Sequence, residues 1–155
     1  MAYTMTLWVH SWLRWAVLGL GMAAVGRALL GWRSRRPWGV GDRRLQLAFV
    51  TSVDIQFLLG LLLYFVLSPL TPKSGEAWRA SMRVPWLRFF AIEHTFTMLL
   101  AVATFHVASV LSRKAPDDAG RHRRWWVGVA AGLLIIAVGI PWPGLSYGRP
   151  LLRLP

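Results

Sequence analysis

The chain has 155 residues, 55% of them hydrophobic, and carries 18 Lys and Arg against six Asp and Glu, a net charge of +12. A chain of this length forms one domain. Its basic residues cluster in short segments between long apolar runs, which is typical of membrane proteins and excludes the continuous basic face of a nucleic-acid-binding domain. The absence of cysteine excludes disulfides, thiolate metal sites, iron–sulfur clusters and covalently attached haem.

Four apolar runs each approach the roughly 20 residues that a helix needs to cross a bilayer. They cover residues 6–30, 45–67, 86–111 and 125–142, and the last run is the shortest. The segments between them contain Pro, Gly and charged residues, which end helices. The sequence therefore predicts an all-α integral membrane protein with a single transmembrane domain, built as an up-down four-helix bundle.

The distribution of basic residues predicts the orientation of this bundle. Ten of them lie in the first and third loops: Arg33, Arg35, Arg36, Arg43, Arg44, Arg113, Lys114, Arg121, Arg123 and Arg124. Six lie on the opposite side: Lys73, Arg79, Arg83, Arg88, Arg149 and Arg153. Because the side with more basic residues stays in the cytoplasm, we expect both termini outside, in a multi-pass protein of the bacterial inner membrane.

The first run carries two polar residues near its outer end. His10 and Arg14 are four residues apart and therefore share one face of a helix. Toward the inner end the same face continues through Val17, Gly21 and Ala24, so its side chains become smaller. Small residues permit the close approach of another helix or of a flat ligand, and ordinary helix packing alone also explains them.

Polar residues also interrupt the second and third runs. Gln56, Gly60 and Tyr64 follow one another at intervals of four and form one stripe on the second helix. Asp54 in the second run and His106 in the third both fall in the inner half of their runs. An unpaired ionisable group is costly in hydrocarbon, so we expect Asp54 and His106 to form a polar pair. A proton relay or a second set of ligands is the alternative.

The loop before the third run predicts a short helix on the membrane surface. Ser74 is a candidate N-cap because its hydroxyl can accept a hydrogen bond from a free backbone N–H group. Trp78 and Met82 share one side of this segment, next to Arg79 and Arg83. Such an amphipathic pattern is typical of helices that lie in the interface.

The third run carries His94 at about the depth of His10, counted from the outer ends of the two runs. The first and third helices of an up-down bundle are diagonal neighbours, so two imidazoles can face each other across the core. This arrangement predicts that His10 and His94 are the axial ligands of one b-type haem. Arg14 either pairs with Glu93 or meets an anionic group such as a haem propionate. We expect His122, in the Arg-rich third loop, to be solvated.

Four short motifs are spread over nearly the whole chain: His10-Ser-Trp-Leu-Arg14-Trp, Gln56-Phe-Leu-Leu-Gly60 with Leu63-Tyr64, Glu93-His94, and Ile140-Pro-Trp-Pro143. In this combination the chain resembles a group of small four-span bacterial membrane proteins often labelled cytochrome b-like. The resemblance implies a haem-bearing integral membrane protein with His10 and His94 as its natural ligands. It implies no substrate.

The expected function is that of a one-haem b-type cytochrome that exchanges electrons with a quinone or with a subunit of a larger respiratory or photosynthetic complex. One alternative is a cofactor-free accessory subunit that docks through small residues of the first helix: Ala16, Gly19, Ala23 and Gly26. Another is a small transporter with a polar path lined by Asp54, Gln56, Tyr64 and His106. The sequence contains no catalytic motif and leaves enzymatic activity open.

Overall fold

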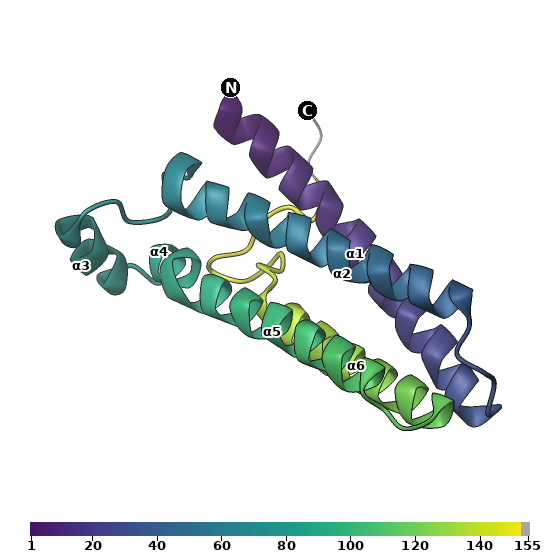
Figure 1. Cartoon of the computed structure of the whole chain (residues 1–155). Helices are drawn as coiled ribbons and strands as arrows, with labels where there is room; N and C mark the ends of the chain where they lie inside the picture. Colours follow the sequence, from purple (N-terminus) through teal and green to yellow (C-terminus); the bar gives the residue numbers. More distant parts are fainter. Residues whose placement is uncertain (153–155) are drawn as a thin grey trace.

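A computed structural model describes residues 1–152, and all regular structure within them is helical (Figure 1). The long helices are α1 (Ala2–Arg33), α2 (Val40–Leu62), α5 (His94–Arg113) and α6 (Asp118–Gly139). The shorter elements are α3 (Gly75–Arg83), α4 (Pro85–Arg88) and the π-helical turns η1 (Leu63–Leu67) and η2 (Phe89–Glu93). Arg153, one of the basic residues counted on the outer side, lies outside the described residues.

Three helical stretches of residues 1–152 are long and apolar enough to cross a membrane: Ala2–Arg33, Val40–Leu67 and Pro85–Arg113. They contain the first three predicted runs. The fourth predicted run, 125–142, falls on α6 and the turn after it, and α6 is not among these three helices. The prediction of an all-helical protein is confirmed, whereas its arrangement as four membrane spans stays a prediction.

The ends of α6 differ from those of the fourth predicted run. The helix begins at Asp118, seven residues earlier, because the side chain of Asp117 accepts a hydrogen bond from the backbone N–H of Gly120 at 2.6 Å. It ends at Gly139 because the following residue, Ile140, is extended and precedes Pro141. Local capping therefore overrides hydropathy at both ends.

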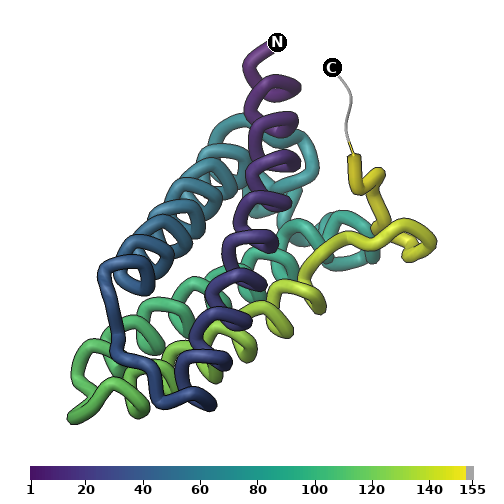
Figure 2. Tube along the Cα trace, turned by 90° about the vertical axis from the view of Figure 1, so that its right-hand side faces the viewer, coloured from purple at the N-terminus to yellow at the C-terminus, as the bar shows by residue number. Residues whose placement is uncertain are grey.

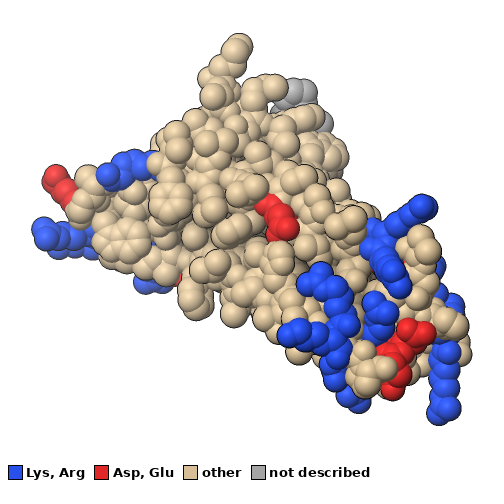
Figure 3. Space-filling view, in the orientation of Figure 1, with Lys and Arg blue, Asp and Glu red and all other residues tan. Residues whose placement is uncertain are grey.

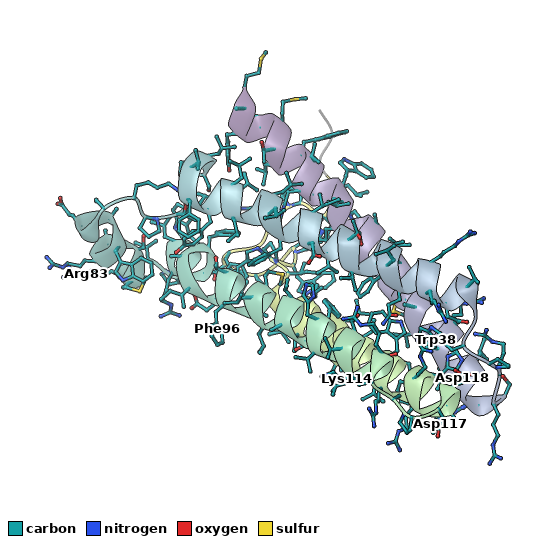
Figure 4. All side chains as sticks on the ribbon, in the orientation of Figure 1. Trp38, Arg83, Phe96, Lys114, Asp117 and Asp118 are labelled. Atoms are coloured by element: carbon teal, nitrogen blue, oxygen red, sulfur yellow. The ribbon has the colours of Figure 1, made fainter. Side chains whose placement is uncertain are left out.

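We expect the Asp117→Ala variant to lose about 1 kcal/mol of stability, since it leaves a free N–H group at the helix N-terminus. Asp117 and Asp118 lie together at this end of α6 (Figure 4). The matched control is Asp117→Asn, which keeps a side-chain acceptor at the same position and should unfold like the parent protein. Unfolding in denaturant, followed by circular dichroism, measures both variants. Equal losses in the two variants would contradict a capping role.

The long helices form two antiparallel hairpins, α1–α2 and α5–α6 (Figures 1 and 2). Helix α6 packs closely against α5 and α1, whereas α2 meets α5 over fewer residues. The hairpins converge at the end that carries the 34–39 and 114–117 loops and diverge toward the N-terminus (Figure 1). Lys and Arg side chains gather at the convergent end, and the middle of the visible surface is largely free of them (Figure 3).

Aromatic packing fills the convergent half of the molecule. Phe49 of α2 and Phe105 of α5 are fully buried, with their ring centroids 4.9 Å apart in an edge-to-face arrangement. Phe105 also packs onto Gly132 of α6, where an added Cβ would collide with its ring. This packing holds the two hairpins together in the convergent half, whereas their opposite ends are apart (Figure 1).

His122 is not solvated, contrary to the prediction. It belongs to α6, is fully buried, and its Nε2–H donates to the backbone carbonyl of Arg36 at 3.0 Å. Its ring lies 4.8 Å from that of Trp38 and occupies the space left by the missing side chain of Gly31. The early start of α6 explains the difference, because it places His122 on the inward face of a helix instead of in a loop.

The turn between α1 and α2 is organised by Asp42, which is buried in the first turn of α2. Its carboxylate accepts hydrogen bonds from Arg36 at 2.7 and 2.8 Å, from Arg27 at 2.9 Å and from the backbone N–H of Gly39 at 2.9 Å. The hydrogen bonds to Asp42 raise the pKa of the Arg36 guanidinium. This network fixes the Arg-rich end of the α1–α2 hairpin.

The predicted short helix is present as α3, and its place at the membrane surface stays a prediction. The hydroxyl of Ser74 accepts a hydrogen bond from the backbone N–H of Ala77 at 3.2 Å, which confirms the predicted N-cap. Trp78 is exposed, and Arg83 projects from the end of the helix away from the rest of the molecule (Figure 4). Helix α3 therefore lies at the divergent end of the molecule and outside the packed helices.

Candidate functional site

A cavity of about 480 Å³ lies between the two hairpins. Both His10 of α1 and His94 of α5 line it, together with residues of α2, η1 and the segment after α6. The lining is mainly apolar, and the volume is in the range of roughly 300–1,000 Å³ that is typical of cofactor and small-molecule sites. The two histidines that the sequence places at one depth therefore share one cavity.

His94 is oriented by α6. Its Nδ1–H donates to the backbone carbonyl of Gly139, the last residue of α6, at 2.8 Å. In this tautomer Nε2 keeps the lone pair with which an imidazole binds a metal, and a backbone carbonyl is a typical second partner of a metal-binding histidine. His94 directly follows the π-helical turn η2, and such turns are frequent at functional sites.

His10 is held from α2. The side-chain amide of Gln56 donates to the backbone carbonyl of His10 at 2.9 Å. Gly60, one turn further along α2, lies next to the imidazole, and a Cβ at this position would be in ordinary van der Waals contact with Cε1 of His10, at 3.4 Å. Nδ1 of His10 is buried and has no hydrogen-bond partner among the described residues. Nδ1 of His122 is also buried without a partner in residues 1–152, but of these two residues only His10 lines the cavity.

Two arginines line the cavity together with the histidines. Arg14 donates to the backbone carbonyl of Leu151 at 2.5 Å, and the guanidinium of Arg149 lies 5.3 Å from the ring centroid of Phe90. The segment after α6 therefore folds back over the divergent end and adds a second cation to the one expected from the sequence. These cations favour a ligand with anionic groups at this end of the cavity.

The alternative pairing of Arg14 with Glu93 does not occur. Glu93 instead accepts a hydrogen bond from Arg88 at 2.7 Å, with both side chains about half exposed. The reason is the π-helical turn η2 between them, which brings residues five apart onto the same side of the chain. Arg14 thus remains on the cavity wall.

Tyr64 and Thr71 close one edge of the cavity. The hydroxyl of Tyr64 donates to the backbone carbonyl of Ala91 at 3.0 Å, which ties η1 to η2. Lys73 donates to Thr71 Oγ1 at 2.9 Å and to the carbonyl of Tyr64. Partial burial of its ammonium group lowers the pKa of Lys73. The polar groups at this edge are therefore occupied by one another.

Asp54 and His106 form the predicted pair, with Asp54 Oδ1 2.8 Å from His106 Nε2. Their side chains are nevertheless 44% and 49% exposed, and neither lines the cavity. The pair bridges α2 and α5 from the outside. Gln56 and Tyr64 line the cavity instead, so the structure does not bring together the four residues of the proposed transport path.

All four motifs that carry the resemblance contribute to the cavity wall. The contributing residues are His10, Ser11, Arg14, Gln56, Phe57, Gly60, Leu63, Tyr64, His94, Ile140 and Pro141. Sequence reasoning missed Arg149 and Phe90. The available signal for Arg149 was the proline-rich stretch that ends α6, because a chain that cannot continue as a helix must turn back.

No group of three or more His, Asp or Glu side chains within residues 1–152 is placed to hold a bare metal ion. A haem iron needs only one or two protein ligands, because the porphyrin supplies four nitrogens. Comparisons with protein families, with characterised proteins and with solved structures find no match to this chain.

Proposed function

We propose that this chain is a b-type cytochrome-like membrane protein that holds one haem between His10 and His94. The observation that carries the proposal is the shared cavity: both imidazoles line it, and each has a ring nitrogen that is not engaged by the protein. When bound, haem would supply reversible one-electron redox chemistry at its iron. A quinone or a partner subunit would be the other electron carrier.

The residues of the cavity have distinct roles in this proposal. The carbonyl of Gly139 fixes the tautomer and the ring orientation of His94, and Gln56 fixes the backbone at His10. Arg14 and Arg149 would meet the propionate groups, since guanidinium groups bind carboxylates with two parallel hydrogen bonds. The apolar lining excludes water and thereby tunes the reduction potential.

A visible spectrum tests the proposal. The protein is expressed with haem supplied, purified in detergent and measured before and after reduction with dithionite. We expect a Soret band that sharpens on reduction, and a pyridine extract with the spectrum of haem b. Colourless protein would overturn the proposal, and a different tetrapyrrole in the extract would overturn the identity of the cofactor.

One observation favours the accessory-subunit alternative. The small residues Ala16, Gly19, Ala23 and Gly26 are all exposed on α1, and a Cβ added at Gly19 or Gly26 would meet nothing within 4 Å. This stripe is free to receive another helix. Colourless protein that purifies with a larger membrane complex would support this alternative over the cytochrome.

We also propose four membrane spans in the bacterial inner membrane with both termini outside. The helical hairpins place the 34–39 and 114–117 loops at one end (Figure 1), and Lys and Arg side chains gather at this end (Figure 3). Because this end should stay in the cytoplasm, a phosphatase that is active only in the periplasm should be inactive when fused after Pro116 and active when fused after Pro155. Reporter activity in whole cells measures both fusions. The opposite pattern would show that the topology is inverted. Equal activity of the two fusions would show that one of the proposed spans does not cross the membrane.

A further inference from the structure

The Asp54–His106 pair occupies an unusual place for polar side chains. It lies on the outer surface of Val40–Leu67 and Pro85–Arg113, two stretches apolar enough to cross a membrane, and both side chains are nearly half exposed. Ionisable groups in membrane spans almost always face the interior of a bundle or a water-filled cavity. The cavity of this protein lies elsewhere, so the single chain leaves the pair facing lipid.

Apolar side chains surround this pair. Leu47 and Leu58 lie on the same stripe of α2 as Asp54, at 68% and 63% exposure, and Val107 of α5 is 56% exposed next to His106. Water therefore has little access to the pair in a bilayer. Any group that completes its hydrogen bonds must come from another protein surface.

The Asp54–His106 pair has one hydrogen-bond donor and one acceptor left over, so two copies of the pair can bond to each other. The contact between Asp54 Oδ1 and His106 Nε2 leaves Oδ2 and Nδ1, for which the described residues provide no hydrogen bond. An electrically neutral pair is favoured in hydrocarbon, and it exposes one donor and one acceptor whichever residue carries the second proton. A twofold axis next to the pair would place the donor of each copy opposite the acceptor of the other.

From this geometry we propose that the exposed α2–α5 face carrying Asp54 and His106 is the interface with a second copy of this chain. Each copy completes the hydrogen bonds of the other pair, and the leucines around it exclude lipid. The interface lies on the outside of the cavity wall, so the dimer leaves His10 and His94 free for a ligand. The inference rests on the proposed membrane location and is independent of haem.

The absence of cysteine from the chain allows a direct test by cross-linking. Leu58→Cys places one thiol on the proposed interface. The matched control is Leu134→Cys, a leucine that is 70% exposed on α6 at a similar number of residues from the Arg-rich end. In native membranes, a bifunctional maleimide should join Leu58→Cys chains into a species of twice the monomer mass, with several-fold higher yield than Leu134→Cys chains.

Substitutions of the polar pair separate this interface from random encounters. In the Leu58→Cys background, Asp54→Ala and His106→Ala should each reduce the cross-linked fraction to that of the Leu134→Cys control. The exchange variant, Asp54→His with His106→Asp, keeps one donor and one acceptor and should restore it. Equal yields at the two cysteines, dimers that persist without the pair, or an adduct with a protein of another mass would each overturn the proposal.

Two further measurements keep the proposals distinguishable. Resistance of the chain to extraction by alkaline carbonate reports its membrane location, and the visible spectrum of the same preparation reports haem. Colourless protein that cross-links through Leu58→Cys would overturn the cytochrome and keep the dimer. Haem-containing protein that does not cross-link would overturn the dimer and keep the cytochrome.

Discussion

Replacing His94 by alanine is expected to abolish the low-spin haem spectrum, and His10→Ala should do the same. Each substitution removes one of the two imidazoles that line the cavity, and low-spin ligation of the proposed haem would need both. The low-spin absorption bands should disappear completely. The variant protein should be either colourless or show a shifted, high-spin spectrum. Absorption and electron paramagnetic resonance spectra of the purified variants measure it.

The control for these variants is His106→Ala, since His106 lies outside the cavity and should leave the spectrum unchanged. His122 is unsuitable because it is fully buried at the other end of the molecule. If an alanine variant does not accumulate, His94→Gly with added imidazole supplies the missing ligand and should restore the bands. A Soret band that survives both single substitutions unchanged would contradict ligation by this pair.

The largest effect on stability is expected from Phe105→Ala, with a loss of about 3–5 kcal/mol. Phe105 has no exposed surface, and its ring contacts Phe49 and packs onto Gly132, so its removal leaves a cavity where the hairpins are joined. Because this packing also positions the open ends of the hairpins, the variant should bind haem less tightly. Unfolding of the purified protein in denaturant measures the loss.

Phe96→Ala is the matched control for this loss. Phe96 lies on the same helix, is 65% exposed and points away from the packed helices (Figure 4). Its substitution should change the free energy of unfolding by no more than about 0.5 kcal/mol, as is usual for surface positions. Similar losses at Phe96 and Phe105 would show that the convergent core does not hold the hairpins together.

The sequence determined the features that depend on local chemistry. Long apolar runs form helices wherever Pro, Gly and charge do not interrupt them, so the first three predicted runs all lie within helical stretches, although composition did not reveal the π-helical turns η1 and η2. The N-cap of α3 follows from Ser74 for the same reason. The regular rise of a helix also predicted that His10 and His94 lie at a similar depth, and in the structure both line one cavity.

The tertiary structure alone decided what surrounds these residues. The divergence of the hairpins, and hence the cavity, depends on close packing of α5 and α6 around glycines that hydropathy does not distinguish. The return of the segment after α6 brings Arg149 to the cavity, although the two histidines lie far from it in the sequence. The inward position of His122 and the outward position of the Asp54–His106 pair depend on the rotation of each helix. That rotation is set by contacts between helices, and a single sequence carries no direct record of them.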